Sequence, residues 1–193
     1  HLYDGTLALA EENNGVNRGG VISTSGATSQ VTLHGGVIEN GVTTDRGGNI
    51  YVGGGTLDIC GATIQNGTAN SGNVNGGGNI FALGSSTVTM SAGKVIGGYT
   101  TKTGGNICVG TSTLIVTGGE ISGGKAEKAA DNLYVYYNVG SNAQISGGYI
   151  ESLHYADSVN PVEISGNPKI GLLDIAAGKT IVLGELTEGA DIT

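Results

Sequence analysis

The hexapeptide GGNIYV (residues 47–52) returns as GGNIFA (77–82) and as GGNICV (104–109). Two looser copies, GGVIS (19–23) and DNLYVY (131–136), stand in the same register. The aliphatic residues that anchor these copies are separated by 28, 30, 27 and 26 residues: Ile22, Ile50, Ile80, Ile107 and Leu133. A period of this length is typical of a solenoid, in which each repeat is one supersecondary unit stacked on the last.

Each repeat carries two further apolar clusters. In the second cluster, such as Leu57, Asp58 and Ile59, apolar and polar residues alternate, which is the period of a β-strand. The third cluster follows the end of the second by five residues in every repeat, as Ile64 follows Ile59. A step that is the same in five repeats indicates a fixed corner, whereas the other connections vary in length and should project outward.

These patterns together predict the fold. Short strands can form sheets if the chain coils and each strand pairs with its equivalent about 4.8 Å away in the next coil. Crossovers between parallel strands are overwhelmingly right-handed. We therefore predict an all-β protein, a right-handed parallel β-helix (solenoid) with three strands per coil and 26–30 residues per coil. Its core should contain columns of aliphatic side chains. Each fully buried side chain should stabilise the fold by about 1.5–3 kcal/mol.

The spacing also predicts the domain organisation. Three aliphatic residues near the C-terminus are 19 residues apart: Ile145, Ile164 and Leu183. We predict a single β-helix domain over residues 1–193, with regular coils over 19–150 and short terminal coils over 151–193. Residues 1–18 are less regular and are either an N-terminal cap or a truncated coil. Because the chain begins at His1 without a signal-like segment, we expect it to be cut from a longer polypeptide with neighbouring domains.

Composition excludes several classes of protein. Glycine supplies 38 of the 193 residues, but there are only two prolines and no Gly-X-Y period, so the chain is not collagen-like. A hydrophobic fraction of 38% with 12% charged residues does not fit a disordered chain. The net charge of −8, without a Lys/Arg cluster, argues against a nucleic-acid partner. No apolar run approaches the roughly 20 residues of a membrane-spanning helix, so no membrane insertion is expected.

The repeats resemble a known family. The series GGNIYV…LDICGATIQNGTA, GGNIFA…VTMSAGKVIGG and GGNICV…LIVTGGEISGG is similar to the β-helix repeats of adhesin-like bacterial surface and secreted proteins of the gut Gram-positive type. The similarity covers residues 19–150, and residues 162–190 resemble the closing coils of such proteins. A more distant similarity is to the repeats of polymorphic outer-membrane proteins. The resemblance implies this fold and an extracellular or cell-wall-associated bacterial setting, but it does not imply a ligand, because one fold hosts many functions.

A column of asparagines is the first candidate site. The four residues stand at the same point of consecutive coils: Asn49, Asn79, Asn106 and Asn132. Amides stacked in this way can hydrogen-bond to one another, so we expect a structural ladder, with contact to a polar ligand as the alternative.

A stripe of aromatic residues is the second candidate. Its members follow the asparagines: Tyr51, Phe81, Tyr134 and Tyr136, with Cys108 between them. Side chains alternate along a strand, so these residues should point outward if Ile50 and Val52 point inward. An exposed stripe could stack on sugar rings and bind a glycan. The alternative is that the rings pack on one another beneath the variable loops.

Catalytic groups are scattered through the sequence. Polysaccharide lyases with this fold pair acidic Ca²⁺ ligands with an Arg or Lys base on one sheet face. Here Asp58 falls on a strand, whereas Arg46 and Lys102 fall in separate loops. Hydrolysis needs two carboxylates across a cleft, and no strand carries such a pair at alternating positions. Catalysis is therefore not expected.

Potential metal ligands are equally dispersed. His34 and His154 are isolated and lack the spacing of a metal site, so no metal or other cofactor is expected. Cys60 and Cys108 fall on different predicted sheets, which argues against a disulfide between them.

Three functions remain, in order of preference. The first is a non-catalytic spacer or adhesin-like module of a larger secreted or cell-surface bacterial protein, with a glycan or a host or cell-surface protein as partner. The second is a carbohydrate-binding module that uses the aromatic stripe. The third is a β-helix enzyme that acts on polysaccharides as a lyase or hydrolase.

Overall fold

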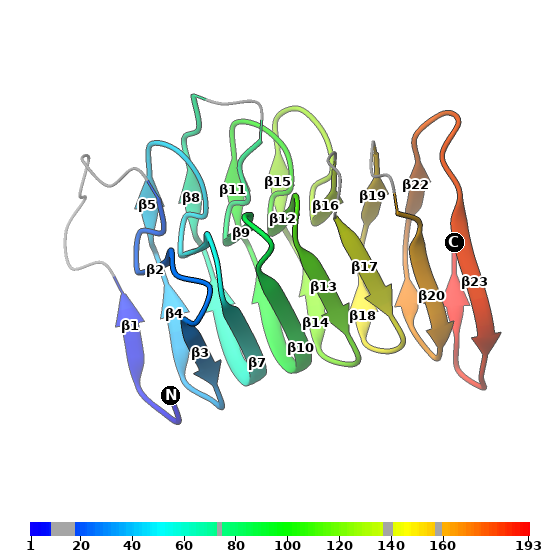
Figure 1. Cartoon of the computed structure of the whole chain (residues 1–193), viewed down its shortest axis with the longest axis horizontal. Coiled ribbons are helices and arrows are strands. Elements are labelled where there is room, and N and C mark those ends of the chain that lie inside the picture. Colours follow the sequence, from blue (N-terminus) through cyan, green and yellow to red (C-terminus); the bar gives the residue numbers. More distant parts are fainter. Residues whose placement is uncertain (9–17, 73–74, 137–140, 157–159) are drawn as a thin grey trace.

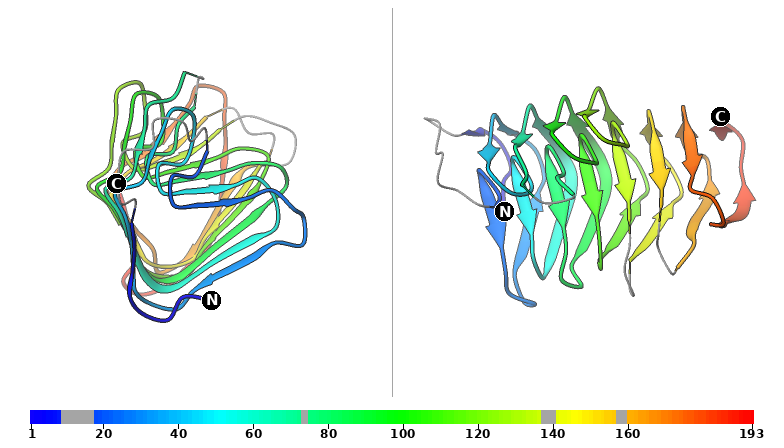
Figure 2. Two further views of the ribbon diagram at one scale, coloured as in Figure 1. Left: turned by 90° about the vertical axis from the view of Figure 1, so that its left-hand side faces the viewer. Right: turned by 90° about the horizontal axis from the view of Figure 1, so that it is seen from above.

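The computed structural model describes residues 1–8, 18–72, 75–136, 141–156 and 160–193. Every regular element in these ranges is a β-strand, and the strands pair in parallel from one coil to the next. Figure 1 shows successive coils side by side along the long axis, from β1 (Thr6–Ala8) to β23 (Ile181–Leu186). The end-on view in Figure 2 shows the coils superimposed around a common interior. The chain is therefore an all-β parallel solenoid, and its described part has no helix that could cross a membrane.

The first apolar cluster of each repeat forms a seven-stranded sheet. Its strands, in spatial order, are β2 (Ile22–Thr24), β6 (Ile50–Val52), β9 (Ile80–Ala82), β12 (Ile107–Val109), β16 (Leu133–Val135), β19 (Leu153–Tyr155) and β22 (Leu173–Ile175). Each strand pairs only with its equivalents in the neighbouring coils, as the repeat spacing predicts.

The second and third clusters share one bent sheet of 13 strands. The second cluster supplies β3 (Gln30–Leu33), β7 (Thr56–Gln65), β10 (Thr87–Ile96), β13 (Thr113–Val116), β17 (Asn142–Ile145), β20 (Val162–Gly166) and β23. The third supplies β4 (Val37–Glu39), β14 (Glu120–Ser122), β18 (Tyr149–Ile150), β21 (Lys169–Ile170) and β24 (Asp191–Ile192), while β1 pairs with β4. Strands β7 and β10 run through the predicted corner without a break, because their backbones stay paired through a register shift there.

A third, smaller sheet differs from the predicted three strands per coil. Four coils contain an additional two-residue strand: β5 (Val42–Thr43), β8 (Thr68–Ala69), β11 (Tyr99–Thr100) and β15 (Lys125–Ala126). The sequence placed these residues in a variable outward loop. Each loop nevertheless begins at a fixed distance from the third cluster, and its first residues therefore stay in register with the next coil.

The core consists of the predicted aliphatic columns. In the seven-stranded sheet the pairing places the anchor residues in one line: Ile22, Ile50, Ile80, Ile107 and Leu133. A second line runs through the bent sheet: Val31, Leu57, Val88, Leu114 and Ala143. From Ile50 to Leu133 the anchors are fully buried. Burial of apolar area in these columns is the main favourable term for a core that contains few aromatic residues.

The two glycines of the GGN motif have different structural roles. The first adopts a left-handed backbone conformation in each of four coils, with φ between 61° at Gly19 and 71° at Gly104, which glycine tolerates at no steric cost. The second lies where the coils approach most closely. A Cβ atom on Gly78 would lie 2.0 Å from the carbonyl oxygen of Gly105 and 2.4 Å from the backbone nitrogen of Tyr99. The motif is thus a turn followed by a backbone contact.

Replacement of Gly78 by alanine should therefore destabilise the protein strongly. The new methyl group would meet backbone atoms of two other segments, and we expect a loss of about 3 kcal/mol, the upper end of overpacking costs. Gly72→Ala is the matched control, because a Cβ there meets no atom within 4 Å and we expect at most ~1 kcal/mol of change. Denaturant unfolding of both variants measures the difference. Equal midpoints would contradict the close approach.

The coils shorten toward the C-terminus. The small sheet ends at β15, and only Glu151 and Ser152 connect β18 to β19 in the next coil. The loop of residues 123–132 therefore projects past its shorter neighbours and makes a step in the surface. At the opposite end, β1 continues the bent sheet, whereas residues 9–17 of the predicted N-terminal cap or truncated coil lie outside the described ranges.

Candidate functional site

The four predicted asparagines form a continuous hydrogen-bonded column. The Nδ2 atom of Asn49 donates to Oδ1 of Asn79 (2.7 Å), and the same contact joins Asn79 to Asn106 (2.7 Å) and Asn106 to Asn132 (2.8 Å). All four side chains are buried. Because none of them faces solvent, the column is a structural ladder in this structure and offers no polar surface to a ligand.

Each amide of the ladder also bonds to the backbone. Oδ1 of Asn79 accepts the N–H of Gly67 (2.8 Å), and Nδ2 of Asn79 donates to the carbonyl oxygen of Ile96 (2.9 Å). Asn49 and Asn106 make the equivalent contacts in their own coils. The ladder therefore ties the end of the third cluster to the start of the next first cluster. Buried polar groups that are fully satisfied in this way rigidify a core.

The ladder ends where the coils shorten. Ser152 stands at the equivalent position of the next coil, and the Nδ2 atom of Asn132 donates to Oγ of Ser152 (3.0 Å) and to Oε2 of Glu151 (3.1 Å). Oε2 of Glu151 also accepts the N–H of Gly123 (2.6 Å). The sequence analysis did not single out Glu151. Its position directly after the third cluster, just before Ser152 takes the place of the ladder asparagine, was the available signal.

The aromatic stripe faces away from the core, as alternation predicts, but its first half is not exposed. Register places Tyr51, Phe81, Cys108 and Tyr134 in one outward column. Phe81 and Cys108 have no exposed surface and Tyr51 is only 5% exposed, so the expectation of an exposed stripe is wrong for this half. These side chains form a second small core, on which Tyr134 and Tyr136 pack as partly buried neighbours.

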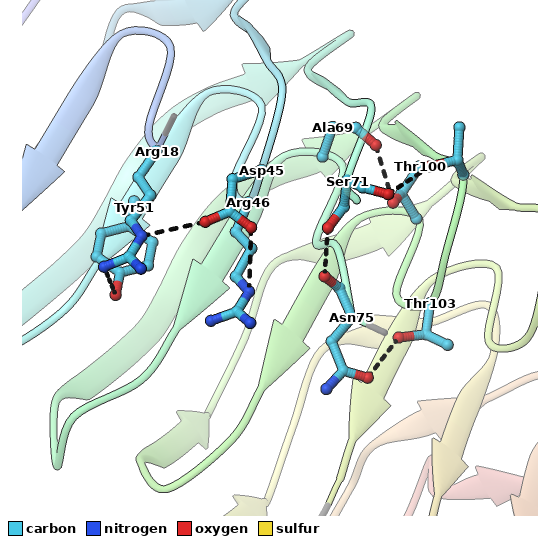
Figure 3. Close-up of polar contacts among 10 residues, drawn as sticks. Arg18, Asp45, Arg46, Tyr51, Ala69, Ser71, Asn75, Thr100 and Thr103 are labelled. Atoms are coloured by element: carbon cyan, nitrogen blue, oxygen red, sulfur yellow. Dashed lines mark hydrogen bonds and ion pairs between the residues drawn. The ribbon is translucent and has the colours of Figure 1, made fainter. Parts of the chain in front are cut away.

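Charged loop residues cover this second core, and Figure 3 shows Arg18, Asp45 and Arg46 beside Tyr51. The guanidinium carbon of Arg18 lies 5.1 Å from the ring centre of Tyr51, and that of Arg46 lies 4.9 Å from the ring centre of Phe81. Asp45 forms ion pairs with both arginines, at 3.2 Å to Nε of Arg18 and 3.4 Å to Nε of Arg46. Cations over aromatic faces are attracted by the ring quadrupole. The arginines therefore occupy the surface on which a sugar ring would have to stack.

Polar loop residues cover the part of the second core that lies toward the C-terminal coils. Oγ of Ser71 donates to the carbonyl oxygen of Asn75 (3.0 Å), and Oγ1 of Thr103 donates to Oδ1 of Asn75 (3.2 Å), as Figure 3 shows. Burial beneath these loops raises the pKa of the Cys108 thiol, so the thiol stays protonated and unreactive. Burial, with a smaller contribution from Cys108, likewise raises the pKa of Tyr136 to about 12. The phenol is therefore neutral at physiological pH.

The outward column continues past the aromatic residues into the short coils. Tyr134 is followed in register by His154 and then by Asp174. The rings of Tyr134 and His154 are 5.4 Å apart, and Nδ1 of His154 makes a short contact with Oδ2 of Asp174. His154 is therefore not isolated, contrary to the expectation from the sequence. The 20-residue spacing of Leu153 and Leu173 was the signal that would have paired these two side chains.

The other candidate catalytic and metal-binding residues do not come together. Asp58 lies in β7 and accepts a hydrogen bond from Thr89 on the outward face of the bent sheet. Arg46 lies in the loop before β6, which belongs to the seven-stranded sheet. Among the described residues no group of three or more histidine, cysteine, aspartate or glutamate side chains could hold a metal ion. Cys60 is exposed and Cys108 is buried, and both are free thiols.

A hollow of about 830 Å³ lies at the step in the surface. The loop of residues 123–132 forms one wall, and residues from β19 and β22 form the other side. Its ionisable lining residues are Lys125, Lys128, Asp131, Glu151, His154 and Asp174. The last residue of the asparagine ladder, Asn132, and the last residues of the outward column, His154 and Asp174, all line this hollow.

No protein-family model, curated protein or solved structure matches this chain.

The ladder provides a direct test of its structural role. Asn79→Ala would leave the N–H of Gly67 and one Nδ2 hydrogen of Asn49 buried without an acceptor, and we expect a loss of about 2–4 kcal/mol in the free energy of unfolding. Asn70→Ala, at an exposed position outside the ladder, should change it by less than ~0.5 kcal/mol. Chemical denaturation measures both. A ladder variant as stable as the control would show that the amide column contributes nothing.

Proposed function

We propose that this chain is a rigid, non-catalytic module of a larger secreted or cell-surface bacterial protein, in which it acts as a spacer or an adhesin-like surface. The observation that carries the proposal is the unbroken coil-to-coil bonding. Backbone pairing, the aliphatic columns and the asparagine ladder all run along the same axis. A module built in this way resists bending and holds whatever precedes and follows it at a fixed separation.

Two further features support this role over catalysis. The candidate catalytic side chains lie on different faces, and the one strongly buried thiol is kept protonated. A right-handed winding of the coils, which we infer from the crossover rule, is compatible with this role. An exposed free thiol at Cys60 fits an anaerobic extracellular setting better than an oxidising one.

The distance between two spin labels tests the rigidity. Thr32 and Val182 lie on the same outward column of the bent sheet, joined through five intermediate register partners. Six strand spacings of ~4.8 Å predict a separation of about 29 Å between their Cα atoms. Labels at Thr32→Cys and Val182→Cys, in a Cys60→Ser background, should give one narrow distance distribution near this value in double electron–electron resonance.

One control sharpens that measurement. Adding the Gly78→Ala substitution to the labelled protein should broaden the distribution, because it disturbs the coil contact between the labels. A broad distribution in the parent protein would contradict the rigid module.

The non-catalytic part of the proposal has its own test. Incubation of the chain with pectin, alginate, xylan and cell-wall glycans, with and without Ca²⁺, should release no reducing ends and no ultraviolet-absorbing unsaturated uronides. The physical reason is that Asp58, Arg46 and Lys102, the candidate catalytic residues named from the sequence, do not lie on one face. Product release that disappears with Asp58→Asn, but persists with Glu188→Gln, would establish a lyase instead.

A further inference from the structure

The hollow at the step is a consequence of the change in coil length. The small sheet contributes one strand to each long coil, and β15 is the last of them. The next coil passes from Ile150 to Leu153 through two residues only, so no strand of the described residues pairs with the free side of β15. The space that another loop would fill, about 830 Å³, lies within the range of ~300–1,000 Å³ of small-molecule pockets.

Two carboxylates in this hollow are held in place by the protein backbone. Oδ1 of Asp131 accepts the N–H of Ala126 (3.0 Å), and Oε2 of Glu151 accepts the N–H of Gly123 (2.6 Å). The second oxygen of each carboxylate has no hydrogen-bond partner among the described residues. A carboxylate fixed by one oxygen presents the other as an acceptor with little loss of side-chain entropy when a ligand binds.

Donors and apolar surface lie beside these acceptors. The ammonium groups of Lys125 and Lys128 are exposed and make no ion pair among the described residues. Leu172, which is 56% exposed, and the ring of His154 supply apolar surface on the opposite wall. His154 is oriented by its contact with Asp174 and by the ring of Tyr134. The hollow therefore offers fixed acceptors, exposed donors and apolar surface.

We propose that this hollow is a binding site for a short, uncharged saccharide. Sugar hydroxyls can donate to Asp131 and Glu151 and accept from the lysines, while the C–H face of a ring packs on Leu172 and His154. The proposal deepens the adhesin-like part of the proposed function and rests on it. It differs from the aromatic stripe, because Tyr51 and Phe81 take no part in it.

The same geometry disfavours two other ligand classes. Three carboxylates against two lysines repel a uronic or sialic acid, in a chain whose net charge is −8. A peptide strand would add to the edge of β15 through backbone N–H groups. The N–H groups of Gly123 and Ala126 are already bonded to Glu151 and Asp131, which protects this edge.

Glycan-array screening followed by calorimetric titration tests the proposal. The intact chain is screened against neutral and acidic saccharides and against an extended-peptide library, and the best neutral ligand is then titrated into variants. Asp131→Asn and Glu151→Gln keep an oxygen that can accept the backbone N–H but remove the carboxylate. Each should weaken binding by roughly tenfold to a hundredfold, the usual effect of losing a charge-assisted hydrogen bond.

Controls separate binding from folding. Glu188→Gln changes an exposed glutamate just after Thr187, at the corner beside Gly166, and should bind like the parent. Lys128→Ala, at an exposed side chain in the hollow, should weaken binding without lowering the melting temperature. Absence of any saccharide binding, binding of acidic sugars or peptides alone, or full affinity in all three hollow variants would overturn the proposal. A narrow spin-label distribution in the same preparation would leave the rigid-module function standing.

Discussion

Parallel pairing of each strand with its own equivalent one coil away is the constraint on which this structure depends. It places equivalent positions of the repeat above one another, so an inward-facing position has a similar environment in each of the long coils. An aliphatic position becomes a buried column, an asparagine position becomes the ladder, and the second glycine of the GGN motif allows backbones to approach as Gly78 approaches Gly105. Backbone geometry, more than side-chain bulk, sets which residues the motif accepts.

The sequence predicted those features that repeat at constant spacing. The parallel all-β solenoid, the column from Ile22 to Leu133 and the meeting of the four asparagines all follow from intervals counted along the chain. The extra two-residue strands were missed because they lie in loops of variable length, where no fixed step marks the register. Single-residue alternation gave the direction of the aromatic side chains correctly, since alternation is a local property.

The exposure of the aromatic side chains was not predicted correctly, because it depends on segments that are distant in sequence. Alternation alone does not reveal that Arg18 and Arg46 lie over Tyr51 and Phe81. The contact between His154 and Asp174 was missed for a related reason: it requires the 20-residue spacing of Leu153 and Leu173, which is shorter than the spacing of the earlier coils. The sequence thus predicted the orientation of side chains well, but it predicted poorly their contacts with residues distant in sequence. The hollow at the step is formed by such contacts, so the sequence did not predict it.

The asparagine ladder has a direction. Every amide donates toward the C-terminal coils and accepts from the N-terminal side, so the small dipoles of the side chains add head to tail. The partial positive charge at the donor end meets the carboxylate of Glu151, much as a helix terminus meets a capping anion. Gain or loss of a whole coil within the array would leave this polarity unchanged. The number of coils can therefore vary during evolution, provided that a closing acceptor such as Glu151 remains after the last amide.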